Sequence, residues 1–224
     1  MKIEAEKFVP GLEGVMAFES DIAFIDGDKP ELSYRGYDIA EIARSLSYES
    51  ITYLLWHGHV PSDSELALFR DALIAERAVP AAVLGVLKTI PSSAHPMATL
   101  RTAVSLIGAL DPDAEVIDLS SLLRKATVLT AQFPIVVAAQ VRFQAGLDPI
   151  SPNPELGHVA NYHYMITGKI PDDLTCQVFE TALILYAEHE TNASTFACRV
   201  VAGTQSDFYS TIVAGIGAIK GPLH

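Results

Sequence analysis

The sequence predicts a mainly α-helical, multi-helical protein with a small β-hairpin or meander near its N-terminus. After Asp38, apolar residues recur at helical spacing, and Ser, Asp and Pro residues mark helix starts between them. Before Asp38, β-branched and aromatic residues flank the turn cluster "DGDKPE". Half of the 224 residues are hydrophobic, which is enough for a sizeable buried core. We therefore expect residues 1–224 to form a single domain.

The β region covers the first 36 residues. "GVMAFESDIAFIDG" predicts one extended stretch and "LSYRG" its return, with Gly27 and Pro30 suited to the turn between them. Helical signals begin at Asp38, which can cap a short helix over 39–45. Ser50 is expected to begin the next helix.

The middle of the chain carries clear signals for helix starts. Ser62 and Glu65 form a capping-box pattern for a helix that extends to about Arg77. Pro80 and Pro91 bracket a shorter helix. These signals predict consecutive helices joined by short connections.

A long apolar helix is expected next. His95-Pro96 opens one helix, and a second extends from about Glu115 to Gly146. We expect the second helix to be kinked or broken near Pro134, because proline lacks a backbone N–H and its ring clashes with the preceding turn. Helices that are apolar on more than one side belong in a multilayer bundle or a subunit interface.

The C-terminal third predicts three further helical stretches. The first covers about 155–167, and the second follows Asp172. The last extends from about 192 to 219, with a possible break near Gly203. The apolar face expected on the second is formed by Leu174, Val178, Ala182 and Leu185.

Charge and composition exclude several classes of function. The formal net charge is -12, so nucleic acid and anionic membrane are poor partners, because both require clustered Lys and Arg. No run of 18 apolar residues occurs, so no transmembrane helix is expected. The charged start "MKIEAEKFVP" has no apolar segment of the kind found in signal peptides. With only Cys176 and Cys198, a reduced cytoplasmic location is expected.

Five of the seven histidines are interpreted as structural. His57 and His59 end a helix, and a metal site there would need further ligands that the sequence does not offer, so capping or surface positions are favoured. His95 precedes a helix start. His158 and His163 are five residues apart, which places them on different helix faces.

His189 is different because it ends an apolar stretch between two carboxylates, Glu188 and Glu190. These carboxylates would favour a protonated ring, which suits contact with an anion. The alternative is a histidine at a helix end among solvated glutamates.

The segment "GIGAIKG" has glycines at a GxGxxxG spacing but no preceding strand, so it is interpreted as a site of close helix packing, not as a phosphate-binding loop. Pro222 then stops the helix and places His224 on a loop.

Several of these stretches, in order along the whole chain, resemble the citrate synthase family in its shorter prokaryotic form. The last is the most specific, because family members carry a similar His-Glu-Asn-Ala-Ser-Thr-Phe run and a Gly-Pro-Leu-His run at similar separation. The matching stretches are "GLEGVMAFESDIAFIDGD", "LSYRGYDIAEIA", "YLLWHGHVPS", "HPMATLRTAVS" and "ALILYAEHETNASTFACRVVAGTQSDFYSTIVAGIGAIKGPLH".

The resemblance implies a mainly α homodimer that condenses acetyl-CoA with oxaloacetate, with a coenzyme A thioester as substrate and no metal or redox cofactor. His224 matches the histidine that hydrogen-bonds the thioester carbonyl and stabilises the enol. His189 matches the histidine that contacts oxaloacetate and citrate. Asn192 and Ser194 match positions that support the first of these histidines. Tyr186 departs from the pattern, since many family members have histidine there.

The larger departure is at the C-terminus. In the family, Gly-Pro-Leu-His continues into a portion that holds the carboxylate base, a second catalytic histidine, the oxaloacetate-binding arginines and most of the coenzyme A site. The resemblance therefore implies that residues 1–224 are the N-terminal part of a citrate synthase large domain, without the small domain. We expect this chain alone to be inactive and to need a complementary C-terminal portion.

Three alternatives stay open from the sequence. The chain could act as a non-catalytic dimerisation or regulatory module. It could be a marginally stable truncated product whose apolar faces promote aggregation. It could also belong to a 2-methylcitrate synthase that uses propionyl-CoA, because the residues that distinguish the two substrates cannot be placed in this sequence.

Overall fold

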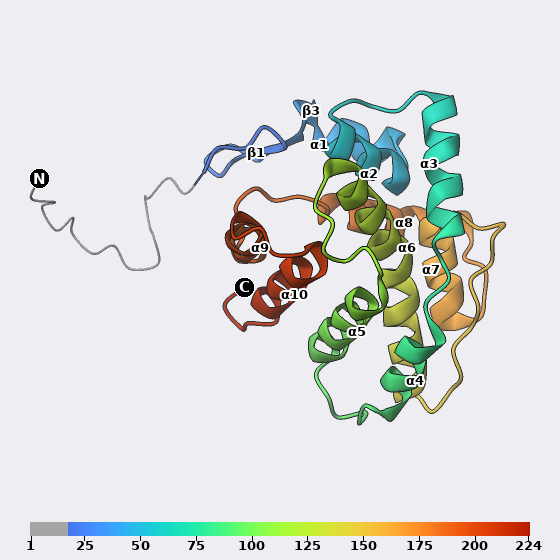
Figure 1. The fold of residues 1–224 in the computed structure, drawn as a ribbon. Helices are drawn as coiled ribbons and strands as arrows, with labels where there is room; N and C mark the ends of the chain where they lie inside the picture. The colour runs from blue at the N-terminus through green and yellow to red at the C-terminus, as the bar shows by residue number, and fades with distance from the viewer. Residues whose placement is uncertain (1–17) are drawn as a thin grey trace, which may run out of the picture.

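A computed structural model describes residues 18–224, which form three short strands and ten helices (Figure 1). The mainly α-helical fold with a small N-terminal β element is confirmed. Part of the predicted first strand stretch falls on residues 1–17, outside the described residues. The helices are α1 (Ile39–Ser45), α2 (Tyr48–His57), α3 (Asp63–Ala75), α4 (Ala81–Thr89), α5 (Pro96–Leu110), α6 (Leu119–Gln144), α7 (His158–Thr167), α8 (Asp173–Leu185), α9 (Ala193–Gly203) and α10 (Phe208–Ile219).

The strands form an antiparallel sheet in the order β1-β2-β3 at one edge of the helical body (Figure 1). They cover Ala23–Asp26, Glu31–Tyr34 and Tyr37–Asp38, and Ala23 lies opposite Tyr34 in the register. This end of the β1–β2 pair is buried with apolar side chains of α1, α2 and α8. The sheet is therefore anchored at one end to the two helices that follow it directly and to α8, which comes much later in the chain.

Local capping explains most helix starts. Asp38 caps α1 as predicted, and its carboxylate accepts hydrogen bonds from the backbone N–H groups of the first turn. The predicted start of α2 at Ser50 is wrong. Ser47 caps this helix, and its hydroxyl accepts a hydrogen bond from the N–H of Ser50, so the first turn begins at Tyr48.

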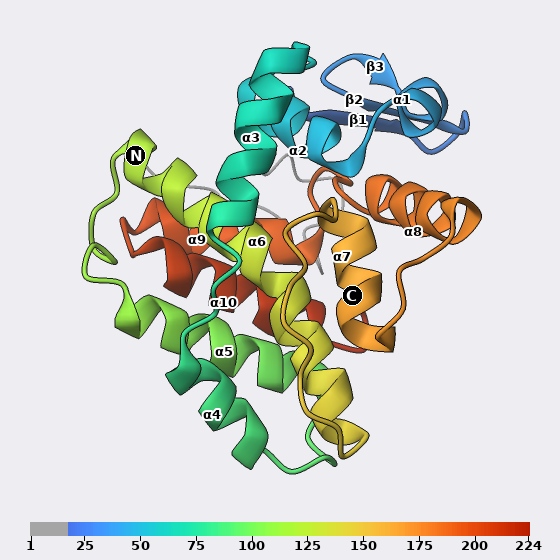
Figure 2. The same ribbon diagram turned by 90° about the vertical axis from the view of Figure 1, so that its right-hand side faces the viewer.

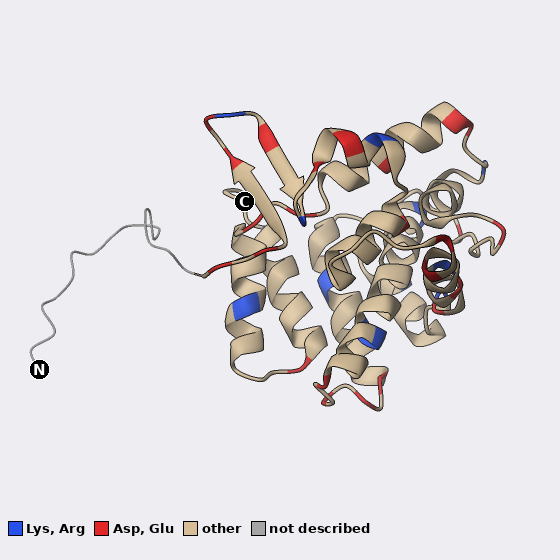
Figure 3. Cartoon of the chain, turned by 90° about the horizontal axis from the view of Figure 1, so that it is seen from above, with Lys and Arg blue, Asp and Glu red and all other residues tan. Residues whose placement is uncertain are grey.

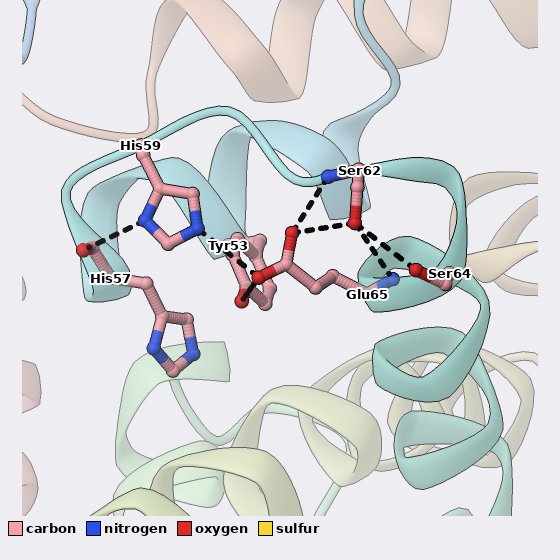
Figure 4. Close-up of polar contacts among 6 residues, drawn as sticks. All are labelled: Tyr53, His57, His59, Ser62, Ser64 and Glu65. Atoms are coloured by element: carbon pink, nitrogen blue, oxygen red, sulfur yellow. Dashed lines mark hydrogen bonds and ion pairs between the residues drawn. The ribbon is translucent and has the colours of Figure 1, made fainter.

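The predicted capping box at the start of α3 is confirmed (Figure 4). Glu65 Oε2 accepts a hydrogen bond from the Ser62 N–H at 2.8 Å, and Ser62 Oγ accepts one from the Glu65 N–H. The other carboxylate oxygen accepts from the Tyr53 hydroxyl and contacts His59 Nε2. These contacts, led by those from Ser62, lower the pKa of Glu65 to about 2. The tilted ring of His57 lies 4.2 Å from that of Tyr53, centroid to centroid, so His57 and His59 both lie in a helix-capping cluster.

Helix α6 is the centre of the helical body and packs against α3, α4, α5 and α7 (Figure 2). Of the kink or break predicted at Pro134, the break does not occur, because α6 continues from Leu119 to Gln144 as one helix. Proline removes one N–H from the helix, and burial of the surrounding turns outweighs that loss. The helix also begins four residues later than predicted, where Asp118 accepts a hydrogen bond from the Ser121 N–H.

By length and composition alone, α6 is the one helix within residues 18–224 that could cross a membrane. Half of its most apolar window is already buried inside the protein. Lys125, within this helix, is fully buried and donates hydrogen bonds to the carbonyls of Ala114 and Val116. In this fold α6 is therefore a core helix.

The apolar face predicted on α8 is exposed. Leu174 and Val178 are 70% and 59% exposed, and Leu185 is also exposed. The buried residue of this helix is Ile184. In the view of Figure 3, Lys and Arg are scattered singly and form no continuous patch.

The burial of His158 predicts how stability depends on pH. This residue is 6% exposed and stacks on Tyr48, and its burial is the main cause that lowers its pKa from 6.5 to about 4. Between these values the unfolded chain binds a proton that the folded chain does not. The free energy of unfolding should therefore fall as the pH decreases from about 6.5 to about 4.

We expect His158→Phe to remove part of this pH dependence, on the order of 2 kcal/mol across that interval, while keeping an aromatic ring against Tyr48. Urea unfolding at several pH values measures it. For each protein, the free energy of unfolding near neutral pH is subtracted from the values at lower pH. This removes the effect of the substitution on packing. Parallel curves for the two proteins would contradict the assignment.

Candidate functional site

His189 lies in the loop between α8 and α9, beyond the helix end where the sequence placed it. Helix α8 ends at Leu185, and the imidazole is exposed. His189 Nε2 lies 2.7 Å from the carbonyl oxygen of Leu185. Because a carbonyl can only accept, Nε2 carries a proton and Nδ1 is left for any further partner.

Two side chains, those of Tyr34 and Glu190, hold this loop through contacts that were not expected from the sequence. The Tyr34 hydroxyl donates to the carbonyl of Ile184 at 2.9 Å and accepts from the N–H of Glu188 at 3.2 Å. Glu190 Oε1 accepts from the backbone N–H of Ile25 at 2.8 Å. All of these partners are more than 145 residues apart in the sequence, so no local pattern indicated them.

The structure brings the other three predicted residues together. Asn192 caps α9, and its Oδ1 accepts from the N–H of Thr195 at 2.7 Å and from the Ser194 hydroxyl at 2.6 Å. His224 Nε2 lies 3.1 Å from Ser194 Oγ. Since the one hydroxyl proton of Ser194 points to Asn192, Ser194 Oγ accepts from the Nε2–H of His224. Asn192, Ser194 and His224 thus form one hydrogen-bonded series.

Close packing of α9 on α10 sets the start of this series. A Cβ atom on Gly215 of α10 would lie 2.5 Å from Cys198 Sγ and 3.5 Å from the Ser194 carbonyl oxygen. The close packing predicted for "GIGAIKG" is therefore confirmed at Gly215. At Gly217 it is wrong, because no atom lies within 4 Å of such a Cβ.

The end of α10 positions His224. The helix ends at Ile219, and the N–H of His224 donates to the Gly221 carbonyl at 3.1 Å in the turn that follows. His224 is exposed, and so is His189. In the part of the chain that the structure describes, no carboxylate forms a hydrogen bond with the His224 ring. His224 therefore offers a hydrogen-bond donor with no carboxylate bonded to it among residues 18–224.

An apolar cavity of about 460 Å³ lies elsewhere, between α2, α6, α7, α8 and α10. Its lining includes Trp56, Phe133, Tyr162 and Phe208, and none of the four predicted site residues. The predicted site is thus an exposed edge formed by the α8–α9 loop, the start of α9 and the turn after α10.

Residues 11–224 match the family model described as "Citrate synthase, C-terminal domain". The chain belongs to the citrate synthase family. It is 44% identical over 218 residues to the citrate synthase of Haloferax volcanii, covering 96% of this chain and 58% of that protein. It is 42% identical over 214 residues to the 2-methylcitrate synthase of Mycobacterium tuberculosis, covering 96% of this chain and 54% of that protein.

Solved citrate synthase structures share the fold. The enzyme of Pyrobaculum aerophilum superposes with a TM-score of 0.90 at 41% identity, over 96% of this chain and 55% of that chain. A ternary complex of the Thermoplasma acidophilum citrate synthase with carboxymethyl coenzyme A and oxaloacetate superposes with a TM-score of 0.93 at 27% identity, over 97% and 57%. The chain therefore spans a little over half the length of these relatives.

The contact at Gly215 gives a prediction with an internal control. We expect Gly215→Ala to destabilise the protein by about 1–3 kcal/mol, because the added methyl group overpacks the α9–α10 contact. Gly217→Ala meets no atom and should stabilise α10, by up to about 1 kcal/mol. Thermal unfolding measures both variants.

The overlap caused by Gly215→Ala can be relieved by a second substitution in α9. Cys198→Ala removes the sulfur that the new methyl group would meet, so the double variant should recover part of the stability lost by Gly215→Ala. Equal effects of the two glycine substitutions would show that the contact is not as close as the geometry indicates.

Proposed function

We propose that this chain supplies part of the active site for the condensation of acetyl-CoA with oxaloacetate to citrate and coenzyme A. The acetyl methyl group loses a proton to give an enol, its carbon attacks the ketone carbon of oxaloacetate, and water hydrolyses the resulting thioester. The observation that carries the proposal is the hydrogen-bonded series Asn192–Ser194–His224. Membership of the citrate synthase family supports the reaction class.

In this proposal His224 donates a hydrogen bond to the thioester carbonyl, where negative charge develops as the enol forms. In the free chain, Nε2–H is engaged with Ser194. A neutral ring that donates from Nδ1 must accept at Nε2. The Ser194 hydroxyl would therefore turn its proton from Asn192 to His224 when substrate binds, while the Thr195 N–H keeps Asn192 Oδ1 paired.

His189 is proposed to contact oxaloacetate. Its Nε2 is tied to the Leu185 carbonyl, so Nδ1 is the atom available to the substrate. A protonated ring would donate from Nδ1 to an oxygen of the dianion and also supply positive charge. The chain has 15 Lys and Arg against 27 Asp and Glu, so a histidine that charges on binding is a useful local cation.

The base that removes the methyl proton is proposed to come from the portion of family members that this chain does not match. That portion could be a continuation of the same polypeptide or a separate complementary chain. Support comes from the extent of the match, 54–58% of the two relatives compared, and from the absence of a carboxylate bonded to His224 in residues 18–224. We propose that it also supplies the second histidine, the substrate arginines and most coenzyme A contacts.

The remaining features of the proposal follow from the family resemblance. The protein would act as a homodimer in the cytoplasm, where its two free cysteines, Cys176 and Cys198, suit a reducing environment. Its chemistry would need no metal and no redox cofactor, because coenzyme A enters as part of the substrate.

A second candidate is the formation of 2-methylcitrate from propionyl-CoA. It is favoured by one observation: relatives with the two names are nearly equally similar to this chain, at 44% and 42% identity. Both reactions use the same carbonyl polarisation and differ by one methyl group. Comparing kcat/KM for acetyl-CoA and propionyl-CoA separates them.

The role of His224 is tested by substitution. We expect His224→Ala to lower kcat by at least about a hundredfold, because it removes a donor to the developing oxyanion. Coenzyme A release from acetyl-CoA with oxaloacetate measures it, in protein produced in its own cells so that any further portion is present. His163→Ala is the control and should keep activity, because the His163 ring is bonded to the Lys169 carbonyl and takes no part in the proposed site. Unchanged activity of His224→Ala would refute the assignment.

Ser194 gives a second test, because its proposed effect acts through the orientation of His224. Ser194→Ala should lower kcat by about ten- to a hundredfold with little change in KM for oxaloacetate. Ser194→Thr keeps a hydroxyl and should restore part of the loss. An equal loss in both variants would favour a packing role at the start of α9.

A further inference from the structure

Tyr34 is a buried polar side chain that the reaction does not use directly. It lies at the end of β2 with none of its surface exposed, although it carries a hydroxyl group. Burying a hydroxyl without partners is costly, so the groups that it bonds indicate its role. All of them lie at the C-terminal end of α8 and in the loop that carries His189.

The hydroxyl joins the end of the helix to the loop. It donates to the Ile184 carbonyl at 2.9 Å, lies 3.4 Å from the Leu185 carbonyl, and accepts from the Glu188 N–H at 3.2 Å. The last carbonyls of a helix have no partner within the helix, so a buried donor there fixes how the chain leaves it. Leu185 is also the residue whose carbonyl holds His189 Nε2.

A second contact fixes the far side of the loop. Glu190 has a left-handed backbone with φ +55°, and its Oε1 accepts from the N–H of Ile25 in β1 at 2.8 Å. A residue other than glycine holds this conformation only where its surroundings impose it. The loop is therefore tied on either side of His189 to two adjacent strands of one sheet.

From these contacts we propose that Tyr34 is a positioning residue for His189. By fixing the Leu185 carbonyl, it keeps the acceptor of His189 Nε2–H in place, so the neutral ring carries its proton on Nε2 and presents Nδ1 outward. The small sheet then acts as a brace for the loop, with Glu190 as its second attachment. The meaning of this brace for substrate binding rests on the proposed contact of His189 with oxaloacetate.

The tautomer of His189 tests the proposal without any ligand. In the chain with ¹⁵N-labelled histidine at about pH 8, the two ring nitrogens of His189 should show a proton on Nε2 and none on Nδ1. Its signals are assigned by their loss in His189→Gln. Tyr34→Phe removes only the hydroxyl and should shift both nitrogens toward the average of the two tautomers.

Tyr37→Phe is the matched control, because Tyr37 lies in the same sheet and is 42% exposed. It should leave the His189 signals unchanged. Signals of Tyr34→Phe that equal those of the unsubstituted chain would overturn the proposal. So would an equal shift in both variants, which would indicate a general effect on the sheet.

Oxaloacetate provides a separate readout. If it binds through His189, it should shift the Nδ1 signal of the unsubstituted chain, and Tyr34→Phe should weaken its affinity about five- to tenfold. Because the substrate arginines are proposed to lie in the further portion, this readout uses protein produced in its own cells, and no response of His189 there would refute the proposed substrate contact. The positioning role would still be decided by the tautomer measured without ligand.

If Tyr34→Phe does not fold, variants of Glu190 provide a second test of the proposal. Glu190→Gln retains a carbonyl oxygen for the Ile25 N–H, whereas Glu190→Ala removes it. We expect the tautomer signature to be kept by Glu190→Gln and lost in part by Glu190→Ala. Identical signatures in these two variants would contradict the idea that the sheet braces the loop.

Discussion

The position of α10 between two other helices is the constraint on which the site depends. At Gly215 it meets α9 so closely that a Cβ atom would overlap Cys198 Sγ. On its other side, a Cβ atom on Gly108 of α5 would lie 2.6 Å from Tyr209 Cβ of α10. The Tyr209 hydroxyl donates to Asp111 just beyond α5, which ties the two helices together. Side chains that pack directly on a glycine in both contacts leave α10 little freedom to slide, and this holds the turn with His224 against Ser194.

Signals within a few residues of one another made much of the fold predictable. The cap at Asp38, the capping box at Ser62 and the prolines around α4 are all local, and the structure contains each of them. The start of α2 was misplaced locally, by choosing Ser50 over the cap Ser47, whereas two other errors occurred where distant packing overrides local preference. Helix α6 stays continuous at Pro134 because it is buried on several sides. The spacing of apolar residues in α8 predicted an apolar face, but it could not show whether another element covers that face, and the face is exposed.

The site shows the same limit. A family resemblance selected His189, Asn192, Ser194 and His224, and the structure joins the last three through hydrogen bonds. The sequence could not place His189 beyond the end of its helix, because the loop conformation depends on the distant β strands. It could not find Tyr34 either, since a tyrosine in a short strand looks like an ordinary core residue. Physical signals for such contacts exist only in three dimensions.

The separation of Tyr34 from its partner has a consequence for the order in which the site is assembled. The Tyr34–Ile184 contact closes a loop of 150 residues, whereas the Ser194–His224 contact closes one of 30. The entropy of loop closure makes the longer closure about 1.4 kcal/mol more costly when each forms from an open chain. The His224 end of the site can therefore form within a local unit of two helices. The His189 loop acquires its shape only when the first strands, made early in synthesis, meet a helix made much later.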